Sequence, residues 1–382
     1  MMERDPRSTT ESRRRGPHGI VVTYSTRDNE AAHESQTREA VAAKLATVRQ
    51  FEFGGPYDPA TRYATNLYFV PSDTLIGVDA AAKLGIRSER ELFGGVVPHA
   101  FVATKTITHP LVDKHAQAPF GWSRDFAAQV EGAVLRGHTA FSRDDAHRAL
   151  ARLLDHGPAR IKLARGIGGH GQFVIQEAAE LDKLLASIGD AELVSAGVVL
   201  EEHLDQVTTH SVGQVRVAGL VASYWGTQRT THNNRGHEVY GGSDLVVVRG
   251  GFDALRALPL STDAQLAVSR ALVYDGAADA CFAGFVASRR NYDVVEGTDA
   301  RGRRRAGVLE QSWRIGGASA AEVEALLAFL HDESLAAVRA STVEIYGDAP
   351  ALPAQAIVFF SDIDARVGPI THYVIVGPYG DL

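Results

Sequence analysis

The hydrophobic positions of this chain switch between a period of two and a period near four several times in its first third. Strands are predicted at 19–24 and 66–71, where β-branched and aromatic residues run together, and helices at 31–48 and 78–84, where apolar residues recur on one face. Strands that alternate with helices are typical of parallel α/β units. We therefore predict a small parallel α/β domain over residues 17–118.

The central part of the chain is predicted to form two further units, over residues 119–200 and 201–330. In the first, a helical pattern over 120–154 is interrupted at 137–142 and is followed by a strand, a glycine-rich loop and a second strand. The second is richer in β-prone segments. The remaining predicted elements are helices over 177–188 and 264–273, and strands over 197–204, 209–221, 244–249, 282–287, 291–296 and 307–312.

The C-terminal segment, residues 331–382, is predicted to contain a helix over 333–339, a strand over 342–346 and a β-hairpin. The hairpin would consist of residues 356–360 and 371–376. Open hairpin edges tend to pair with other chains, so a homodimer is one expectation for this segment. Packing on the N-terminal domain and a contribution to a substrate site are the others.

A glycine-rich stretch separates the strand that carries Lys162 from the next strand, which begins near Phe173. Four glycines between Gly166 and Gly171 allow positive φ angles and leave backbone N–H groups uncovered, which suits phosphate oxygens. A dinucleotide fingerprint is excluded because that motif opens a helix, and a P-loop is excluded because no Gly-Lys-Ser/Thr occurs. A phosphate-covering hairpin is therefore predicted, with a flexible surface hairpin as the alternative. Only six of the 39 basic residues are lysines, which favours a role for Lys162.

Composition narrows the class of protein. The chain has 382 residues, enough for two or three structural units, and its 45% hydrophobic and 22% charged residues are typical of soluble globular proteins. Its net charge of −7 argues against a nucleic-acid partner, because such partners require clustered basic residues. The arginine-rich turn at 301–305 is predicted to be a solvated hairpin tip. Cys281 is the only cysteine, which excludes an intrachain disulfide and a thiolate metal cluster.

The N-terminal residues 1–16 are polar and arginine-rich and lack an apolar segment, so we predict a disordered tail and no signal peptide. No run of about 18 apolar residues occurs, so no membrane-spanning helix is expected. Together with the single cysteine, these observations predict a cytoplasmic protein without a membrane partner.

Two acidic residues are predicted to face each other on paired strands. Asp293 lies on the strand before the arginine-rich turn and Glu310 on the strand after it. Mg²⁺ binds one or two carboxylates together with phosphate oxygens and water. A magnesium site on this hairpin is therefore predicted, although an isolated acid is more often a surface charge.

Residues 225–243 are unusually polar and are predicted to form a long loop. Such loops are functional or disordered more often than structural. Arg229, His232 and Arg235 are the candidates for binding an anionic substrate and closing over it. A solvated excursion is the alternative.

The order of these motifs resembles the ATP-grasp superfamily, in which two α+β subdomains hold ATP between them. The resemblance rests on Lys162 with its glycine loop, the segment Val199–Leu204, Asp293, and the segment Leu309–Gly317, and covers roughly residues 120–330. The whole chain also resembles an uncharacterised bacterial family of ATP-grasp-like proteins. The implied fold is mixed α+β and α/β, an ATP-grasp fold with a small N-terminal parallel α/β domain and a C-terminal β-hairpin extension.

The resemblance also implies roles for individual residues. Phosphates would be held by Lys162, by a second lysine that is either Lys105 or Lys114, and by the loop, while the hinge between subdomains would read the adenine. Asp293 and Glu310 would bind Mg²⁺, with Ser312 in the place of the usual asparagine ligand, and Arg314 would neutralise a transferring phosphoryl group. The implied ATP-contacting residues are Lys105, Lys114, Lys162, Gly168, Gly169, His170, Gly171, Glu201, Glu202, Leu204 and Asp205.

The chemistry implied by the fold is ATP- and Mg²⁺-dependent ligation. A small carboxylate, such as an amino acid, would be activated as an acyl phosphate and joined to an amine or another nucleophile. Two alternatives remain, an ATP-binding regulatory protein without turnover and a kinase that phosphorylates a hydroxyl. Serine at position 312 and threonine at position 209, where the family has an asparagine and a ribose-binding acid, are departures that favour the first alternative.

Overall fold

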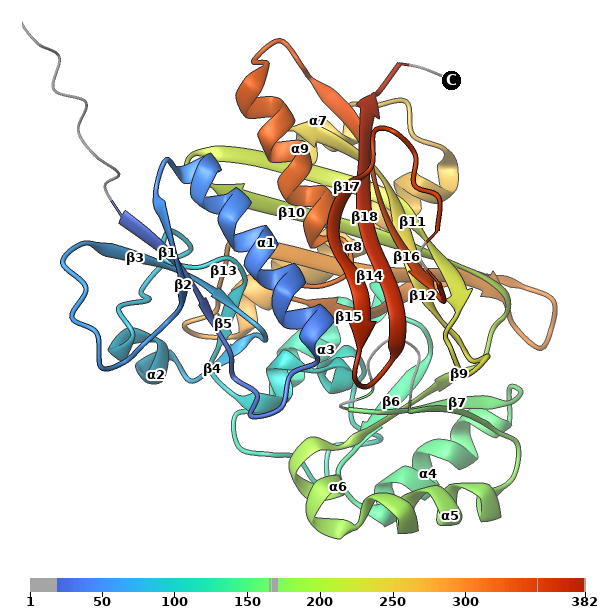
Figure 1. Cartoon of the computed structure of the whole chain (residues 1–382). Coiled ribbons are helices and arrows are strands. Elements are labelled where there is room, and N and C mark those ends of the chain that lie inside the picture. Colours follow the sequence, from blue (N-terminus) through green and yellow to red (C-terminus); the bar gives the residue numbers. More distant parts are fainter. Residues whose placement is uncertain (1–18, 165, 167–170, 349, 381–382) are drawn as a thin grey trace, which may run out of the picture.

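A computed structural model describes residues 19–164, 166, 171–348 and 350–380. The predicted tail at 1–16 and three of the predicted ATP contacts, Gly168, Gly169 and His170, lie outside the described residues. The protein combines a parallel-sheet domain with a large antiparallel sheet and a smaller antiparallel subdomain (Figure 1). The predicted mixed fold class is confirmed.

The N-terminal domain is built on a three-stranded parallel sheet in the order β2-β1-β3. Its central strand is fully buried at Val21 and Val22, as the predicted apolar run requires. A second small sheet, in the order β13-β5-β4, joins this domain to the large sheet. The elements are β1 (Gly19–Tyr24), α1 (Ala32–Arg49), β2 (Glu52–Pro56), β3 (Asn66–Pro71), β4 (Leu75–Ile76), α2 (Val78–Lys83), β5 (Gly95–Val97) and β13 (Val286–Ala287).

A compact subdomain, at the bottom of Figure 1, carries the glycine hairpin on a four-stranded sheet in the order β6-β9-β7-β8. Helices α4 and α5 pack apolar side chains against this sheet and bury Leu150, Leu181 and Leu185. The elements of this subdomain are β6 (Gly137–Ala140), α4 (Arg143–Leu154), β7 (Ala159–Leu163), β8 (Gln172–Ile175), α5 (Ala178–Ile188), α6 (Asp190–Ala196) and β9 (Val198–Glu202). The segments that precede it are η1 (Ala100–Ala103), η2 (Lys105–Thr108), α3 (Arg124–Val130) and η3 (Glu131–Ala133), of which α3 packs against α8 (Thr262–Cys281).

The large sheet has the strand order β15-β14-β10-β11-β12-β16-β18-β17 and is antiparallel throughout. Helices α1 and α9 lie side by side over one face, and α8 packs on the other (Figure 1). The elements are β10 (Asp205–Val217), β11 (Leu220–His232), β12 (Glu238–Arg249), α7 (Phe252–Arg256), α8 (Thr262–Cys281), β14 (Arg289–Thr298), β15 (Arg304–Ser312), α9 (Ser319–His331), β16 (Ala337–Tyr346), β17 (Ile357–Asp364) and β18 (Gly368–Pro378).

The predicted loop over 225–243 is wrong. Strands β11 and β12 run through this segment and leave only a short turn between His232 and Glu238. The polar side chains suggested a loop. They are compatible with strands here because the outer parts of both strands extend into solvent, where no apolar face is required. At the end of the hairpin, Asn234 donates to the carbonyl group of Val367, in the turn between β17 and β18, and to that of Pro369 at the start of β18.

The predicted helix over 333–339 is also wrong, because β16 begins at Ala337. The helix of this region is α9, which the sequence did not indicate. Its residues are buried on nearly every side, so they show no polar stripe and no amphipathic period. The predicted hairpin over 356–376 is present and continues the large sheet through β18 and β16. The interruption at 137–142 is strand β6 followed by Ser142, whose hydroxyl caps α4.

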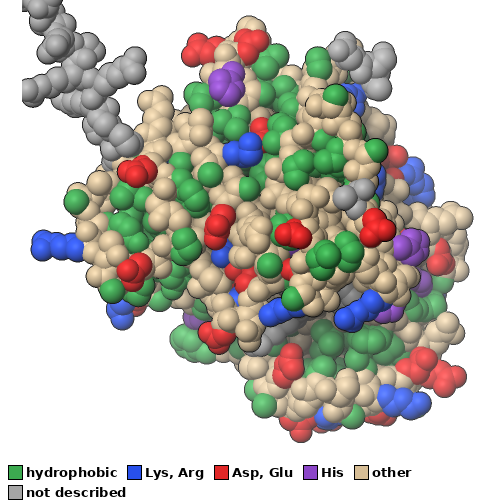
Figure 2. Space-filling model, viewed as in Figure 1, with side chains coloured by type: hydrophobic (Ala, Val, Ile, Leu, Met, Phe, Trp, Pro, Cys, Tyr) green, Lys and Arg blue, Asp and Glu red, His purple; other side chains and the backbone are tan. Residues whose placement is uncertain are grey.

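Basic side chains do not gather into one patch on the visible surface. On the face shown in Figure 2, lysine and arginine side chains are separated from one another by acidic and apolar side chains. Within the part of the chain that the structure describes, no helix is both long and apolar enough to cross a membrane.

Candidate active site

Lys162 is held by a buried acid at the centre of the glycine-hairpin subdomain. Strand β7 pairs with β8 on one side and with β9 on the other, so the predicted hairpin is confirmed. The Lys162 Nζ atom lies 2.6 Å from Oε1 of Glu201, and His109 Nε2 lies 3.1 Å from Oε2 of the same carboxylate. Burial alone would raise the pKa of Glu201, but the charges of Lys162 and His109 lower it to about 2.

Lys105 joins the glycine hairpin to the acid pair of the large sheet. It opens η2 and is buried. Its Nζ atom donates to the carbonyl oxygen of Gly166 at 2.9 Å and lies 2.8 Å from Oε2 of Glu310. Burial alone would raise the pKa of Glu310, but Lys105 and Lys162 lower it below its usual value. The two lysines and Glu310 therefore share one electrostatic environment, although they come from three separate elements.

Asp293 and Glu310 are opposite each other on β14 and β15, as predicted. The Oδ1 atom of Asp293 accepts hydrogen bonds from Gln228 Nε2 at 2.8 Å and from Asn291 Nδ2 at 3.0 Å. Burial and the charge of Glu310 raise the pKa of Asp293 to about 6. Two facing carboxylates that repel each other are the arrangement that a divalent cation stabilises.

Ser312 and Arg314 follow the acid pair along β15 and beyond it. The Ser312 hydroxyl accepts a hydrogen bond from Arg289 Nη1 at 3.3 Å, so it is already engaged. Arg314 donates to the carbonyl oxygen of its neighbour Ile315 at 2.8 Å. Among the described residues, no carboxylate lies within 4 Å of the Arg314 guanidinium. Burial lowers the pKa of Arg314, and Asp73 and Glu310 only partly offset this effect.

The hinge residues have separate environments. The Glu202 carboxylate accepts hydrogen bonds from the backbone N–H of Arg136 at 3.1 Å and from Arg305 Nε at 3.0 Å. These bonds give the Glu202 side chain a structural role. Leu204 is buried between β9 and β10, whereas Asp205 is exposed. Lys114 is also exposed, and the structure therefore brings Lys105, and not Lys114, to Glu310.

The three residues predicted to close over a substrate do not gather at the acid pair. The Arg229 Nε atom lies 2.7 Å from Oδ2 of Asp244, and its Nη2 atom donates to the carbonyl oxygen of Thr342. His232 is the last residue of β11, and Arg235 lies in the following turn, where both are exposed. A closing loop is therefore not present at this position, because the segment is a β-hairpin.

Sequence reasoning missed the residues that orient the acids and lysines. His109 directly follows η2 and Asn291 lies on β14; both are buried polar residues, and neither belongs to a motif. Buried Arg289 pairs with Glu322 of α9 at 2.8 Å and contacts Ser312 as well. Only the long-range fold brings these groups together, so no local pattern could have identified them.

The residues present fit a metal–nucleotide complex. Asp293 and Glu310 supply two carboxylates, and Lys105 and Lys162 supply two cations next to them. A bound Mg²⁺ would neutralise phosphate charge there. Among the described residues, no cluster of three histidine, cysteine or acidic side chains could hold a metal alone.

The comparison with protein families identifies the chain. A family model described as "Protein of unknown function (DUF3182)" matches residues 21–374. The chain belongs to this family. No curated protein matches it.

Solved structures resemble this DUF3182 protein at low sequence identity. An N5-carboxyaminoimidazole ribonucleotide synthetase in complex with ADP has 13% identity and a TM-score of 0.49, over 94% of this chain and 93% of that chain. Phosphoribosylamine–glycine ligase from Thermotoga maritima has 14% identity and a TM-score of 0.49, over 94% and 92%. D-alanine–D-alanine ligase from Bacillus anthracis with ATP has 11% identity and a TM-score of 0.42, over 78% and 86%.

Replacing Glu201 with glutamine is expected to destabilise this DUF3182 protein. At pH 7 the substitution leaves Lys162 buried without its counter-charge, which should lower the free energy of unfolding by about 3 kcal/mol. The pKa of Glu201 is lower in the folded protein than its ordinary value of 4.5, so its ionised form stabilises the fold above that pH. The deficit of E201Q should therefore shrink as the pH falls from 4.5 towards 2.

Urea denaturation across this pH range checks the result. The matched control is E52Q, which removes an exposed carboxylate of β2 and should stay within about 0.5 kcal/mol of the parent chain. Equal stability of E201Q and the parent at pH 7 would show that the Lys162–Glu201 pair is not formed.

Proposed function

We propose that this protein is an ATP-grasp ligase, which uses Mg-ATP to activate a small carboxylate as an acyl phosphate and joins it to an amine or another nucleophile. One observation carries this proposal. Lys105 contacts Gly166 of the glycine hairpin and Glu310 of the acid pair at once. The predicted phosphate cover and the predicted metal site therefore meet at one lysine.

The charges of the site suit phosphoryl transfer. Lys105 and Lys162 would hold phosphate oxygens, and Asp293 and Glu310 would hold Mg²⁺. In the ligand-free protein, both lysines are paired with acids. A triphosphate that arrives with its cation can replace these pairings, since the cation binds the acids and the phosphates bind the lysines.

The substrate carboxylate would lie close to Arg314. This guanidinium has no acidic partner within 4 Å in the described part of the chain, and it follows Glu310 of the acid pair by four residues in the sequence. It can neutralise charge on the carboxylate and on the acyl phosphate that forms from it. Little further acid–base machinery is needed, because positioning and charge neutralisation supply most of the catalysis of phosphoryl transfer.

Ser312 favours a second candidate, an ATP-binding protein without turnover. Its hydroxyl is engaged with Arg289, so it is a weaker third metal ligand than the amide carbonyl that ATP-grasp enzymes place there. In this alternative the protein binds Mg-ATP and releases no ADP.

An assay of ADP release separates the candidates. We expect ADP release from Mg-ATP that requires both a carboxylate and an amine, supplied as mixtures of amino acids and primary amines. Binding of Mg-ATP without ADP release under any mixture would support the regulatory alternative. A stable phosphorylated hydroxyl compound, found by mass spectrometry, would identify a kinase instead.

A further inference from the structure

The segment that carries Arg314 lies beyond the end of its strand. β15 ends at Ser312, and α9 begins only at Ser319. Between these two elements the backbone has no strand ladder or helix to satisfy its polar groups, so they need partners from elsewhere in the protein. The position of the Arg314 guanidinium therefore depends on the contacts that fix these few residues.

Arg289 holds this segment from β14. The residue is only 1% exposed, and its Nε and Nη2 atoms donate to the carboxylate of Glu322 in α9, each at 2.8 Å. Its Nη1 atom donates to the carbonyl oxygen of Ser312 at 3.1 Å and to that of Arg314. Because a guanidinium presents its donors in a rigid fork, the pairing with Glu322 also fixes the direction of Nη1. One buried arginine therefore ties two carbonyl groups of the segment to α9.

Thr74 holds the carbonyl group that lies between these two. Its buried hydroxyl donates to the carbonyl oxygen of Trp313 at 3.1 Å. Thr74 directly precedes β4, and Gly95 of the neighbouring β5 packs so closely that an added Cβ atom would lie 2.9 Å from Cβ of Trp313. Three successive carbonyl groups, of Ser312, Trp313 and Arg314, therefore accept hydrogen bonds from the side chains of Arg289 and Thr74. We call this arrangement the carbonyl clamp.

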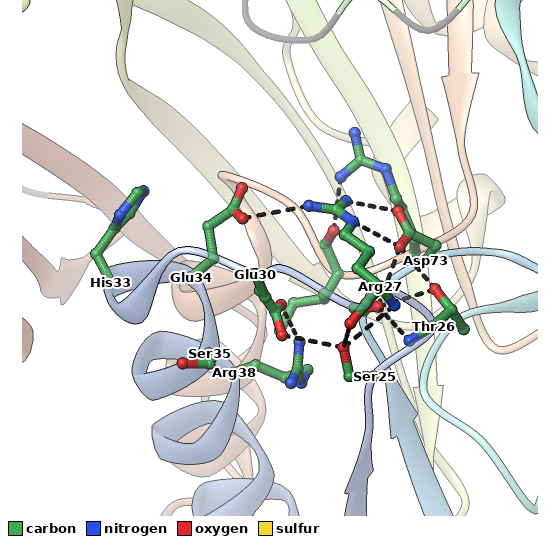
Figure 3. Close-up of polar contacts among 12 residues, drawn as sticks. Ser25, Thr26, Arg27, Glu30, His33, Glu34, Ser35, Arg38 and Asp73 are labelled. Carbon is green, nitrogen blue, oxygen red and sulfur yellow. Dashed lines mark hydrogen bonds and ion pairs between the residues drawn. The ribbon is translucent and has the colours of Figure 1, made fainter. Parts of the chain in front are cut away.

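The residue before Thr74 is itself fixed by an ion pair (Figure 3). The Asp73 carboxylate accepts from Nε and Nη2 of Arg27 at 2.7 and 2.6 Å, and from the hydroxyl of Thr26 at 2.8 Å. Figure 3 shows Arg27 between Asp73 and Glu34 of α1, to which its Nη1 atom donates at 3.2 Å. The N-terminal domain therefore presents Thr74 to the clamp from a backbone that is anchored on both the loop after β1 and α1.

We propose that Arg289 and Thr74 are positioning residues for Arg314, which hold its backbone so that its guanidinium meets the terminal phosphate of bound ATP. Among the described residues, the Arg314 side chain makes one hydrogen bond, to the carbonyl group of its neighbour Ile315. Its placement is therefore set by its backbone, and a small misplacement of a group that contacts a reacting phosphate has a large effect. This inference rests on the proposed function, which supplies the nucleotide and the role of Arg314.

Four variants of the full chain separate positioning from general stability. T74V removes the hydroxyl donor and leaves the carbonyl of Trp313 without it, whereas T74S keeps the hydroxyl and is the conservative rescue. R289K keeps a positive charge beside Glu322 but loses the fork that reaches the carbonyl groups. Its matched control is R290K, which alters the next buried arginine of β14. Arg290 pairs with Asp275 and Asp279 at 2.8 Å and with none of the three carbonyl groups.

Calorimetric titrations compare Mg-ADP with a non-hydrolysable analogue of Mg-ATP, because the two differ in the terminal phosphate. R314Q should bind the analogue about tenfold or more weakly and Mg-ADP within about twofold of the parent chain. T74V and R289K should show the same selective loss, by about fivefold or more, and T74S and R290K should match the parent. A merely structural role would weaken the binding of both nucleotides alike, and that result would overturn the proposal.

Double variants test whether the clamp acts through Arg314. T74V/R314Q and R289K/R314Q should bind the analogue as R314Q does, because a residue that acts through Arg314 has no further effect once that side chain is removed. Additive losses in the double variants would contradict the positioning role.

Hydrogen exchange measured by mass spectrometry tests the clamp without nucleotide. The amide groups of residues 313–318 should exchange about fivefold or more faster in T74V and R289K than in the parent, T74S and R290K. Equal exchange in all five proteins would overturn the clamp. A selective loss of analogue binding in a protein that releases no ADP would contradict the ligase and support the positioning role. ADP release by the parent, with analogue binding unchanged in T74V and R289K, would support the ligase and overturn the positioning role.

Discussion

Mg-ATP is expected to bind about 100-fold more weakly to K162M than to the parent chain. The substitution removes a charge-assisted contact to phosphate and leaves the buried Glu201 carboxylate next to the phosphate site, where it repels the nucleotide. K105M should weaken binding to a similar extent, because Lys105 Nζ lies between the glycine hairpin and Glu310. Calorimetric titration with Mg-ATP and a non-hydrolysable analogue measures both effects.

Lys114 provides the matched control for this prediction. It is exposed and makes none of these contacts, so K114M should bind Mg-ATP within about twofold of the parent chain. The double variant K162M/E201Q removes both members of the buried pair, so it leaves no unpaired buried charge that would unfold the protein. Weak Mg-ATP binding by this variant would therefore report the loss of Lys162 and not a loss of folding. Tight Mg-ATP binding by folded K162M would contradict the phosphate role of Lys162.

The second large effect is expected at the acid pair. D293N and E310Q should each lower the rate of Mg²⁺-dependent ADP release by about 1000-fold or more, because each removes one of two carboxylates that would hold the cation. Their apparent affinity for Mg²⁺, measured from ADP release across a Mg²⁺ titration, should fall as well. The substitution of Asp293 also removes like-charge repulsion, so D293N is not expected to unfold the protein.

Glu296 is the control for the acid pair. It lies on β14, as Asp293 does, but its carboxylate pairs with Arg304 at 3.2 Å instead of facing Glu310. E296Q should keep ADP release within about twofold of the parent chain. If E310Q retained full Mg²⁺-dependent turnover, the cation would have to bind elsewhere.

The sequence predicted the parts of this site that depend on local order. Lys162 and the glycine stretch form a hairpin because β-prone residues flank the glycines, and Asp293 faces Glu310 because one turn joins their strands. The choice between Lys105 and Lys114 could not be made, since it depends on which lysine the fold buries. Lys105 opens a short 3₁₀ helix that no periodic pattern indicates.

The failures of prediction also have physical causes. Residues 225–243 looked like a loop because strands that extend beyond the covered part of a sheet need no apolar face. Helix α9 was missed because burial on nearly all sides removes the polar stripe that marks a surface helix. Thr74 and Trp313 meet only because the segment before β4 packs against the end of β15, which the local sequence does not reveal.

The transfer of isotopic oxygen tests the central claim most directly. The parent chain is incubated with Mg-ATP, an amine mixture and an amino-acid mixture labelled with ¹⁸O in the carboxylate groups, and the released phosphate is analysed by mass spectrometry. An acyl phosphate intermediate transfers one carboxylate oxygen to phosphate, so we predict phosphate that carries a single ¹⁸O atom. Released phosphate without ¹⁸O, or phosphate retained on a hydroxyl product, would contradict carboxylate activation by this protein.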